Sequence, residues 1–223
     1  MKKELFFQAI GKFFAGFVLV GLLIFAPAGT LRFWNGWLLM LILFVPMFCA
    51  GLIMLWKNPD LLRKRLQARE SEGEQKQVIL FSGIMFLAAF ILAGLNFRFQ
   101  WLTLPDWLVW MAAVIFLVAY LLYAEVLREN AYLSRTIEVQ ENQKVVDTGL
   151  YGIVRHPMYA VTLFLFLAMP LVLGSLISFA VMLFYIPIIV KRIRNEEQVL
   201  KEGLVGYDEY CSRVKYRLLP YLW

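Results

Sequence analysis

The stretch that decides the fold occupies residues 159–190 and reads YAVTLFLFLAMPLVLGSLISFAVMLFYIPIIV. A helix needs about 20 apolar residues to cross a hydrocarbon core, so this uncharged stretch is too long for one ordinary crossing. Pro170 and the pair Gly174-Ser175 interrupt it and leave about 16 residues in each half. We predict a tight helical hairpin, either two short crossings or two tilted helices that turn within the membrane. Pro187 is expected to kink the second arm without preventing it from spanning.

Apolar stretches also precede the hairpin. Hydrophobic residues make up 61% of the chain and charged residues only 17%, a composition that excludes a water-soluble globule. The sequence therefore predicts an all-α, polytopic transmembrane helix bundle of five to six membrane helices in a single membrane domain, 1–223. We expect four N-terminal membrane helices within 1–127, and the hairpin followed by a C-terminal helix within 128–223. The four predicted spans are Phe13–Phe25 (slightly extended), Leu38–Trp56, Val78–Phe97 and Trp107–Val126.

The basic residues fall on one side of this topology. Of the 22 lysines and arginines, all but Arg32 and Arg98 lie before the first span, after the second, after the fourth or in the tail. By the positive-inside rule, the N-terminus, both long loops and the tail are expected to be cytoplasmic. A hairpin keeps the tail on that side, whereas a single crossing would not. The isoelectric point near 9.3 thus indicates contact with membrane lipids and not with nucleic acid.

The hairpin also predicts a site. It returns its two ends to the same membrane surface, so Arg155-His156 and Glu196-Glu197 are expected to lie close together although about forty residues separate them. Charges of both signs would then line one pocket beneath an apolar roof. Such a pocket suits a ligand that carries a carboxylate, an amine and hydroxyls.

Other polar groups give weaker signals. Glu125 and Glu129 share a helix face at i and i+4. They indicate either a helix end that reaches water or the wall of a pocket, and both interpretations stay open. Cys49 and Cys211 are too far apart in sequence to indicate a disulfide framework or a metal site.

Two segments carry a family resemblance. GLYGIVRHPMY at 149–159 and RNEEQVLKEGLVGYDEYCSRVKYRLLP at 194–220 resemble the isoprenylcysteine carboxyl methyltransferase and phospholipid methyltransferase group. The resemblance covers roughly the last hundred residues, and the preceding LRENAYLSRTIEVQENQKVVDTG is similar to the bacterial branch. RHPxY alone is a short pattern, but together with the hairpin and the double Glu it is specific. The residues that match the pattern in order are Gly149, Tyr151, Arg155, His156, Pro157, Tyr159, Glu196, Glu197, Tyr207, Tyr210 and Pro220, with Asn130 and Val145-Val146 in the lead-in.

The resemblance implies an enzyme that transfers methyl groups from S-adenosyl-L-methionine. The acceptor would be lipophilic and enter from the bilayer, with carboxyl O-methylation as the reaction and phospholipid (ethanolamine) N-methylation as an alternative. It also implies that the protein lies in a bacterial inner membrane with its cofactor site on the cytoplasmic side, and that the site needs no metal.

The same resemblance assigns roles to residues. Arg155 and Glu197 are the expected catalytic residues, with Arg155 binding an anionic group of the acceptor. Glu196 and Glu197 would bind the ribose hydroxyls or the amino group, and His156 with Tyr159 the methionyl carboxylate. The full expected cofactor-binding set is Gln143, Val145, Val146, Gly149, Tyr151, His156, Tyr159, Glu196 and Glu197.

Two departures from the family pattern accompany these assignments. Val161 stands where the family often has Gly, and could narrow the pocket. Gln143 stands where it often has His, and cannot act as an acid or base.

Two other functions fit the same sequence. Membrane sterol-type reductases that use NADPH have a similar C-terminal half, and the cofactor that raises the melting temperature would separate them from methyltransferases. A transporter or scaffold is the non-enzymatic alternative. It is disfavoured because the spans are almost free of charge and the polar residues gather on one face of the membrane.

Overall fold

The computed structural model describes residues 2–66, 73–130, 132–133 and 139–223. All regular structure in these residues is helical, as the composition predicted. The helices are α1 (Lys2–Ala28), α2 (Trp34–Lys57), α3 (Pro59–Leu66), α4 (Gly73–Phe99), α5 (Asp106–Glu129), the 3-10 helix η1 (Gly149–Gly152), α6 (Pro157–Val172), α7 (Leu176–Met182), α8 (Tyr185–Gly203) and α9 (Tyr207–Arg213).

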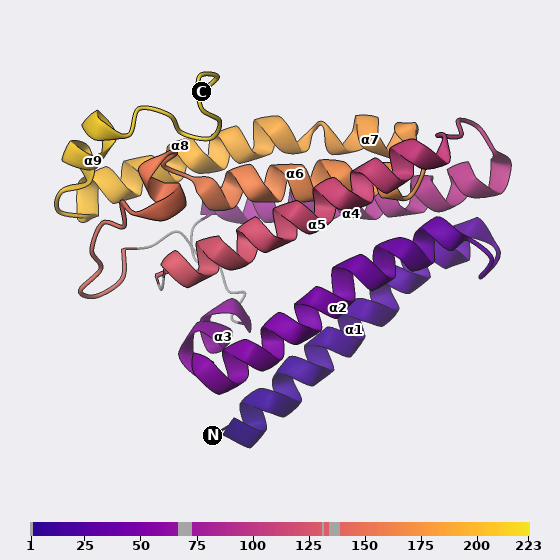
Figure 1. The fold of residues 1–223 in the computed structure, drawn as a ribbon, viewed down its shortest axis with the longest axis horizontal. Helices are drawn as coiled ribbons and strands as arrows, with labels where there is room; N and C mark the ends of the chain where they lie inside the picture. The colour runs from indigo at the N-terminus through magenta and orange to yellow at the C-terminus, as the bar shows by residue number, and fades with distance from the viewer. Residues whose placement is uncertain (1, 67–72, 131, 134–138) are drawn as a thin grey trace.

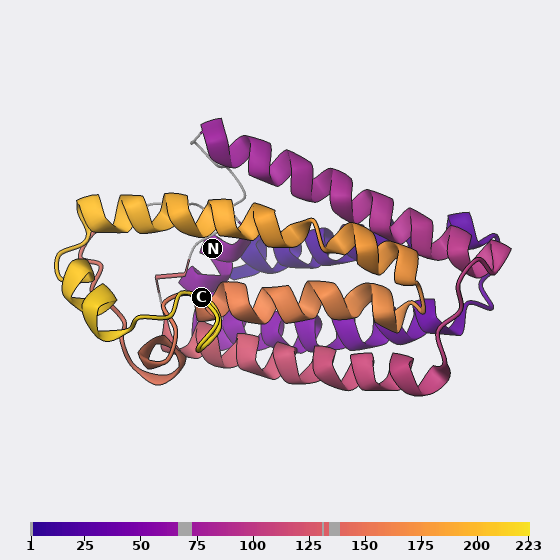
Figure 2. The same ribbon diagram turned by 90° about the horizontal axis from the view of Figure 1, so that it is seen from above.

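Helices α4, α6 and α8 run along the long axis of the molecule, whereas α1 and α2 run obliquely to it in Figure 1. Short turns join the long helices at one end (Figures 1 and 2). The N-terminus, α3, the segment before α6, α9 and the C-terminal tail gather at the opposite end (Figure 1). Five helices in the described residues are long and apolar enough to span a membrane, which confirms the predicted polytopic bundle. They are Lys3–Ala28, Trp34–Lys57, Leu80–Phe99, Asp106–Glu129 and Leu176–Gly203.

The first helix begins well before the predicted span. The sequence placed Lys12 ahead of a span starting at Phe13, but α1 already runs from Lys2. Lys12 lies within the helix, and its Nζ donates to the carbonyl oxygen of Leu66 at 2.6 Å. Because Leu66 is the last residue of α3, the ammonium group satisfies a carbonyl that has no partner within that helix.

The predicted hairpin is present, but it turns later than Pro170. The helix α6 continues through Pro170 and ends at Val172, so the expectation that this proline breaks the stretch is wrong. Gly174 makes the turn and has a φ of 70°. Its N–H donates to the carbonyl of Leu171, and the N–H of Ser175 donates to the carbonyl of Pro170. This is a Schellman motif, which uses glycine because other residues are strained at positive φ. Pro170 is tolerated near the helix end because it removes only one N–H donor.

The second arm is interrupted one turn before Pro187. Helix α7 ends at Met182 and α8 begins at Tyr185. Pro187 has no N–H to donate to the carbonyl of Leu183, and its ring crowds that carbonyl. The N–H of Ile186 donates to Leu183 instead, at 3.1 Å. The expected kink is therefore a short break, and the two helices together still form one candidate span.

The hairpin packs into the bundle through small side chains and satisfied polar groups. Ala112, Ala113 and Ala119 of α5 are buried in the same core cluster as Ala168 of α6, and small residues let membrane helices approach closely. The Ser178 hydroxyl donates to the carbonyl of Ala89 at 2.8 Å, which joins α7 to α4. These contacts fix the hairpin, and thereby the two charged pairs at its base.

Candidate functional site

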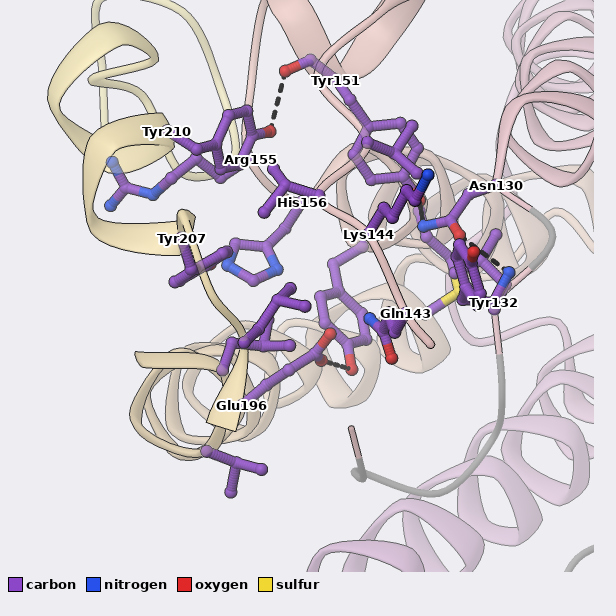
Figure 3. A pocket seen from close by; sticks show the side chains of 18 of the residues that line it. Asn130, Tyr132, Gln143, Lys144, Tyr151, Arg155, His156, Glu196, Tyr207 and Tyr210 are labelled. Carbon is purple, nitrogen blue, oxygen red and sulfur yellow. Dashed lines mark hydrogen bonds between the residues drawn. The ribbon is translucent and has the colours of Figure 1, made fainter. Parts of the chain in front are cut away.

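A polar pocket lies at the end of the bundle where the long connections gather. Its walls come from the segment that leads to α6, the start of α6, the C-terminal half of α8, and α9 (Figure 3). The lining residues are Asn130, Tyr132, Leu133, Gln143, Lys144, Val145, Val146, Tyr151, Arg155, His156, Met158, Tyr159, Arg192, Glu196, Val199, Leu200, Leu204, Tyr207 and Tyr210.

Arg155, His156 and Glu197 meet at the base of the hairpin, as its topology predicted. The Nε atom of Arg155 donates to Oε1 of Glu197 at 2.7 Å, and Nε2 of His156 lies 3.3 Å from the same oxygen. Arg217 from the tail donates to Oε2 at 2.8 Å. The side chains of Arg155 and Glu197 are only 8% and 6% exposed. A buried carboxylate with cationic partners on both oxygens is a strongly held junction.

This junction also fixes the C-terminal tail. The Nη1 atom of Arg155 donates to the carbonyls of Val214 and Lys215, at 2.8 and 3.1 Å. The backbone N–H groups of residues 155 and 156 donate to the carbonyls of residues 216 and 217, both at 2.9 Å. Arg155 lines the pocket, but these recorded bonds direct its Nε and Nη1 atoms to the protein itself. Glu197 does not line the pocket.

Helix α8 presents two neighbouring faces. Ile189, Ile193 and Glu197 follow one another at four-residue spacing and are buried. Arg192 and Glu196, also four residues apart, line the pocket on the next face. Arg192 donates to the Tyr159 hydroxyl at 2.9 Å, and that hydroxyl donates to Glu196 at 2.5 Å. Arg192 was not among the predicted site residues, although its spacing from Glu196 places it on the same helix face.

Three tyrosines form the wall between η1 and α9. The Tyr151 hydroxyl accepts from Nδ2 of Asn130 at 3.0 Å, and the Tyr210 hydroxyl donates to the backbone carbonyl of Tyr151 at 2.8 Å. The Tyr207 hydroxyl is buried and has no hydrogen-bond partner of normal geometry among the described residues, although the weakly polar thiol of Cys211 lies near it. Burial raises the pKa of Tyr207, so this hydroxyl remains a donor at neutral pH.

The glycine at the entrance to η1 has a structural role. Gly149 has a φ of 52°, and a Cβ atom there would overlap the Glu129 carboxylate. That carboxylate accepts from the Thr148 hydroxyl at 3.1 Å, whereas Glu125 pairs with Arg128 at 2.6 Å and is 41% exposed. Glu125 therefore fits a helix end that reaches water, and Glu129 supports the segment that leads into the pocket.

Most of the sequence-predicted site residues lie in the pocket wall. Gly149 and Glu197 do not line the pocket, and Val161 is buried in the helical core and is not one of the lining residues. The sequence named Tyr207 and Tyr210 only as motif positions, and it missed Tyr132, Lys144 and Met158 because nothing in their spacing marks them. The predicted residues that line the pocket are Gln143, Val145, Val146, Tyr151, Arg155, His156, Tyr159 and Glu196.

The donor set defines the kind of ligand that fits. Glu196 offers a carboxylate, Lys144 and Arg192 are cations, and Gln143 is an amide. Tyr207 adds the buried hydroxyl without a partner, and an unpaired buried donor is costly until a ligand satisfies it. A ligand with both charges, hydroxyls and an aromatic ring fits these groups. The chain is thus an integral membrane helix bundle with a polar ligand pocket at one end.

Comparison with known proteins gives a family match over part of the chain. Residues 110–202 match the model of the Isoprenylcysteine carboxyl methyltransferase (ICMT) family, which confirms the resemblance drawn from the motifs. A segment of 91 residues, 40% of the chain, is 34% identical to Delta(14)-sterol reductase TM7SF2 of Mus musculus. It spans only 22% of that relative. This match supports a membrane methyltransferase-like function, and the matched segment contains Arg155, His156 and Glu197.

Proposed function

We propose that the protein is an S-adenosylmethionine-dependent membrane methyltransferase that methylates the carboxylate of a lipophilic acceptor. The observation that carries this proposal is the position of the pocket. Within the segment that matches the family model, Glu196, His156 and Gln143 present a carboxylate, an imidazole and an amide to one cleft. Tyr207, which lies outside that segment, adds a hydroxyl donor.

Each of these residues has a proposed task in binding the cofactor. Glu196 accepts from the amino group or the ribose hydroxyls, and its bond from Tyr159 orients the carboxylate. His156, with Lys144 and Arg192 nearby in the lining, holds the methionyl carboxylate. Tyr151 and Val146 enclose the adenine and thioether, and Tyr207 donates to an acceptor atom of the ligand. We now assign Arg155 and Glu197 as positioning residues, because their recorded bonds run to each other, to His156 and to the tail.

Methyl transfer requires little of the protein beyond positioning the methyl donor and the acceptor. When bound, S-adenosylmethionine supplies a methyl group on a sulfonium; the new O–C bond forms as the C–S electron pair returns to sulfur, which leaves a thioether and an ester. Because a carboxylate acceptor loses no proton, the site needs no general base. An ethanolamine acceptor would have to lose a proton before or during transfer. A carboxylate acceptor therefore requires fewer groups of the pocket than an amine acceptor would.

A nicotinamide-dependent reductase is the second candidate. The identity of 34% with a segment of Delta(14)-sterol reductase favours it, and the same pocket wall could hold another nucleotide. The two candidates differ in the cofactor that they bind, so cofactor binding separates them before any acceptor is known.

The test begins with purified protein in lipid nanodiscs. Thermal unfolding is followed with S-adenosylmethionine, S-adenosylhomocysteine or NADPH, because a ligand that binds the native state raises its stability by mass action. We expect the first two to raise the melting temperature and NADPH to leave it unchanged. Incubation with methyl-labelled donor and either a prenylcysteine or phosphatidylethanolamine then identifies the acceptor. A shift with NADPH alone would replace the methyltransferase proposal by the reductase.

A further inference from the structure

A second cavity lies between α1, α2 and α3, outside the polar pocket. Its volume is about 480 Å³, and apolar side chains such as Phe13, Phe48 and Leu52 form most of its surface. The lining residues include two cations, Lys12 and Arg65, and no carboxylate. An apolar cavity with only positive charge in its wall is complementary to an amphiphile that carries a negative head group.

Arg65 connects this cavity to the polar pocket. It lines the cavity, and its Nη2 atom donates to the Tyr123 hydroxyl at 2.6 Å and lies 4.0 Å from the sulfur of Met158. Met158 in turn lines the polar pocket. The guanidinium carbon also lies 5.5 Å from the centre of the Tyr123 ring. Arg65 therefore stands at the junction of the two cavities.

The two cations differ in what they can offer to a ligand. The Lys12 ammonium is bonded to the Leu66 carbonyl and holds the end of α3. The recorded side-chain partners of Arg65 within the described residues are a neutral phenol and a thioether. Neither compensates its charge, and a guanidinium has five N–H donors in a fork that matches a carboxylate. A carboxylate near Arg65 would thus gain strong charge-assisted hydrogen bonds.

We propose that the cavity between α1, α2 and α3 holds the hydrocarbon chain of the methyl acceptor and that Arg65 binds its carboxylate. This inference rests on the proposed methyltransferase function, to which it adds the place where the acceptor binds and the residue that holds its carboxylate. The acceptor is a single-chain amphiphile with a carboxylate head. Its chain lies against α1 and α2, and its head lies at the junction beside Met158 and the polar pocket.

The experiment measures binding without any methyl transfer. Protein in nanodiscs of zwitterionic lipid is photolabelled with a diazirine-bearing hexadecanoic acid or with the matched hexadecanol, and labelled peptides are mapped by mass spectrometry. We expect the acid to label peptides of α1–α3 about tenfold more than the alcohol, the magnitude of a charge-assisted contact. Labelling spread evenly over the membrane helices would overturn the proposal, as would full displacement by equimolar phosphatidylglycerol, which would make the cavity a phospholipid site.

Two variants with matched controls test the residues. Gly51 lines the cavity and has no atom within 4 Å of a Cβ position, so Gly51→Leu fills it without backbone conflict. Gly83 of α4 is equally open and lies outside the lining, so Gly83→Leu is its control. Arg65→Gln removes the proposed head-group contact, and Arg63→Gln removes an exposed charge from the same helix.

The expected results separate this inference from the proposed function. Gly51→Leu lowers acid labelling about tenfold and Arg65→Gln abolishes the preference for acid over alcohol, while both controls behave as wild type. All four variants retain the thermal shift with S-adenosylmethionine, which shows that they fold. Unchanged labelling of Gly51→Leu would refute binding of the acid in this cavity, whether or not S-adenosylmethionine raises the melting temperature. If S-adenosylmethionine does not raise the melting temperature of the wild type, the methyltransferase proposal is refuted. The labelling result still tests whether the cavity binds the acid.

Discussion

Tyr207 and Tyr210 lie in the same short helix, α9, and their rings pack against each other, yet their hydroxyls differ in hydrogen bonding. Tyr210 donates to the carbonyl of Tyr151, whereas Tyr207 has no partner of normal geometry among the described residues. Removing a bonded buried hydroxyl costs about 1 kcal/mol, while removing an unpaired one can be neutral or stabilising. Loss of the Tyr210 hydroxyl is therefore expected to lower fold stability, and loss of the Tyr207 hydroxyl is expected to weaken ligand binding.

The first prediction compares the two Tyr→Phe variants. Tyr207→Phe should keep or slightly raise the melting temperature of the ligand-free protein and weaken S-adenosylhomocysteine binding by about tenfold, since a lost bond to a polar ligand atom is worth about 1.4 kcal/mol. Tyr210→Phe should lower the free energy of unfolding by about 1 kcal/mol. Isothermal titration and thermal unfolding give both quantities. Equal affinity in Tyr207→Phe and wild type would remove this hydroxyl from the site.

The second prediction concerns the adjacent glutamates. Glu197→Gln leaves the buried Arg155 without its carboxylate and should destabilise the protein by about 3 kcal/mol. Glu196→Gln, at the pocket wall, should change stability by less than about 1 kcal/mol and weaken cofactor binding. Denaturant or thermal unfolding beside a cofactor titration measures the contrast. The reverse pattern, with Glu196 controlling stability, would mean that the two side chains have been assigned to the wrong faces.

This contrast marks the limit of the sequence at the residue scale. The motif placed both glutamates and the Arg155-His156 pair at one site, and the structure brings them together. Adjacent helical residues point about 100° apart, so a motif cannot say which glutamate faces the pocket. Only the packing of α8, with Ile189 and Ile193 on the same buried face as Glu197, decides this.

At the scale of elements, the turn of the hairpin shows which local signals are reliable. Glycine at a helix end and proline near it both interrupt the apolar pattern of residues 159–190. The sequence therefore predicted a break at Pro170 as well as at Gly174. The structure uses Gly174, because its positive φ closes two backbone hydrogen bonds that proline cannot provide. Pro187 acts at the break in the second arm, where the carbonyl of Leu183 accepts from the N–H of Ile186 because Pro187 has no N–H to donate.

The third prediction tests that turn. Gly174→Ala puts a Cβ at ordinary contact distance, 3.4 Å from Nδ2 of Asn35, so its cost is conformational. A non-glycine residue at this φ should lower stability by about 1 kcal/mol. Gly83→Ala, in open space within α4, is the control and should be neutral or slightly stabilising. Thermal unfolding of both variants in the same nanodiscs checks the difference, and equal melting temperatures would show that the turn does not depend on Gly174.

At the scale of the whole molecule, hydropathy was sufficient to predict a polytopic bundle of five to six membrane helices, and the structure has five candidate spans in its described residues. Hydropathy and charge could not predict the cavity between α1, α2 and α3, because its shape depends on how α3 folds back against the first two helices. Nor could they show that Lys12 bonds to the end of α3. Contacts between segments far apart in the chain depend on side-chain packing, which no single stretch of sequence encodes.

The last prediction concerns orientation. We propose that the end with the polar pocket faces the cytoplasm, because the lysines and arginines of the described residues belong to segments at that end, except for Arg32 and Arg98, which lie near the short turns. In a protein with Cys49 and Cys211 replaced by alanine, Val205→Cys reports the pocket end and Leu31→Cys the turn end. Both positions are exposed, Val205 at 95% and Leu31 at 67%. In sealed vesicles with the cytoplasmic face inside, a membrane-impermeant maleimide should label the cysteine at position 31 at once and that at position 205 only after permeabilisation. The opposite order would place the polar pocket on the outer face and exclude a cofactor drawn from the cytoplasm.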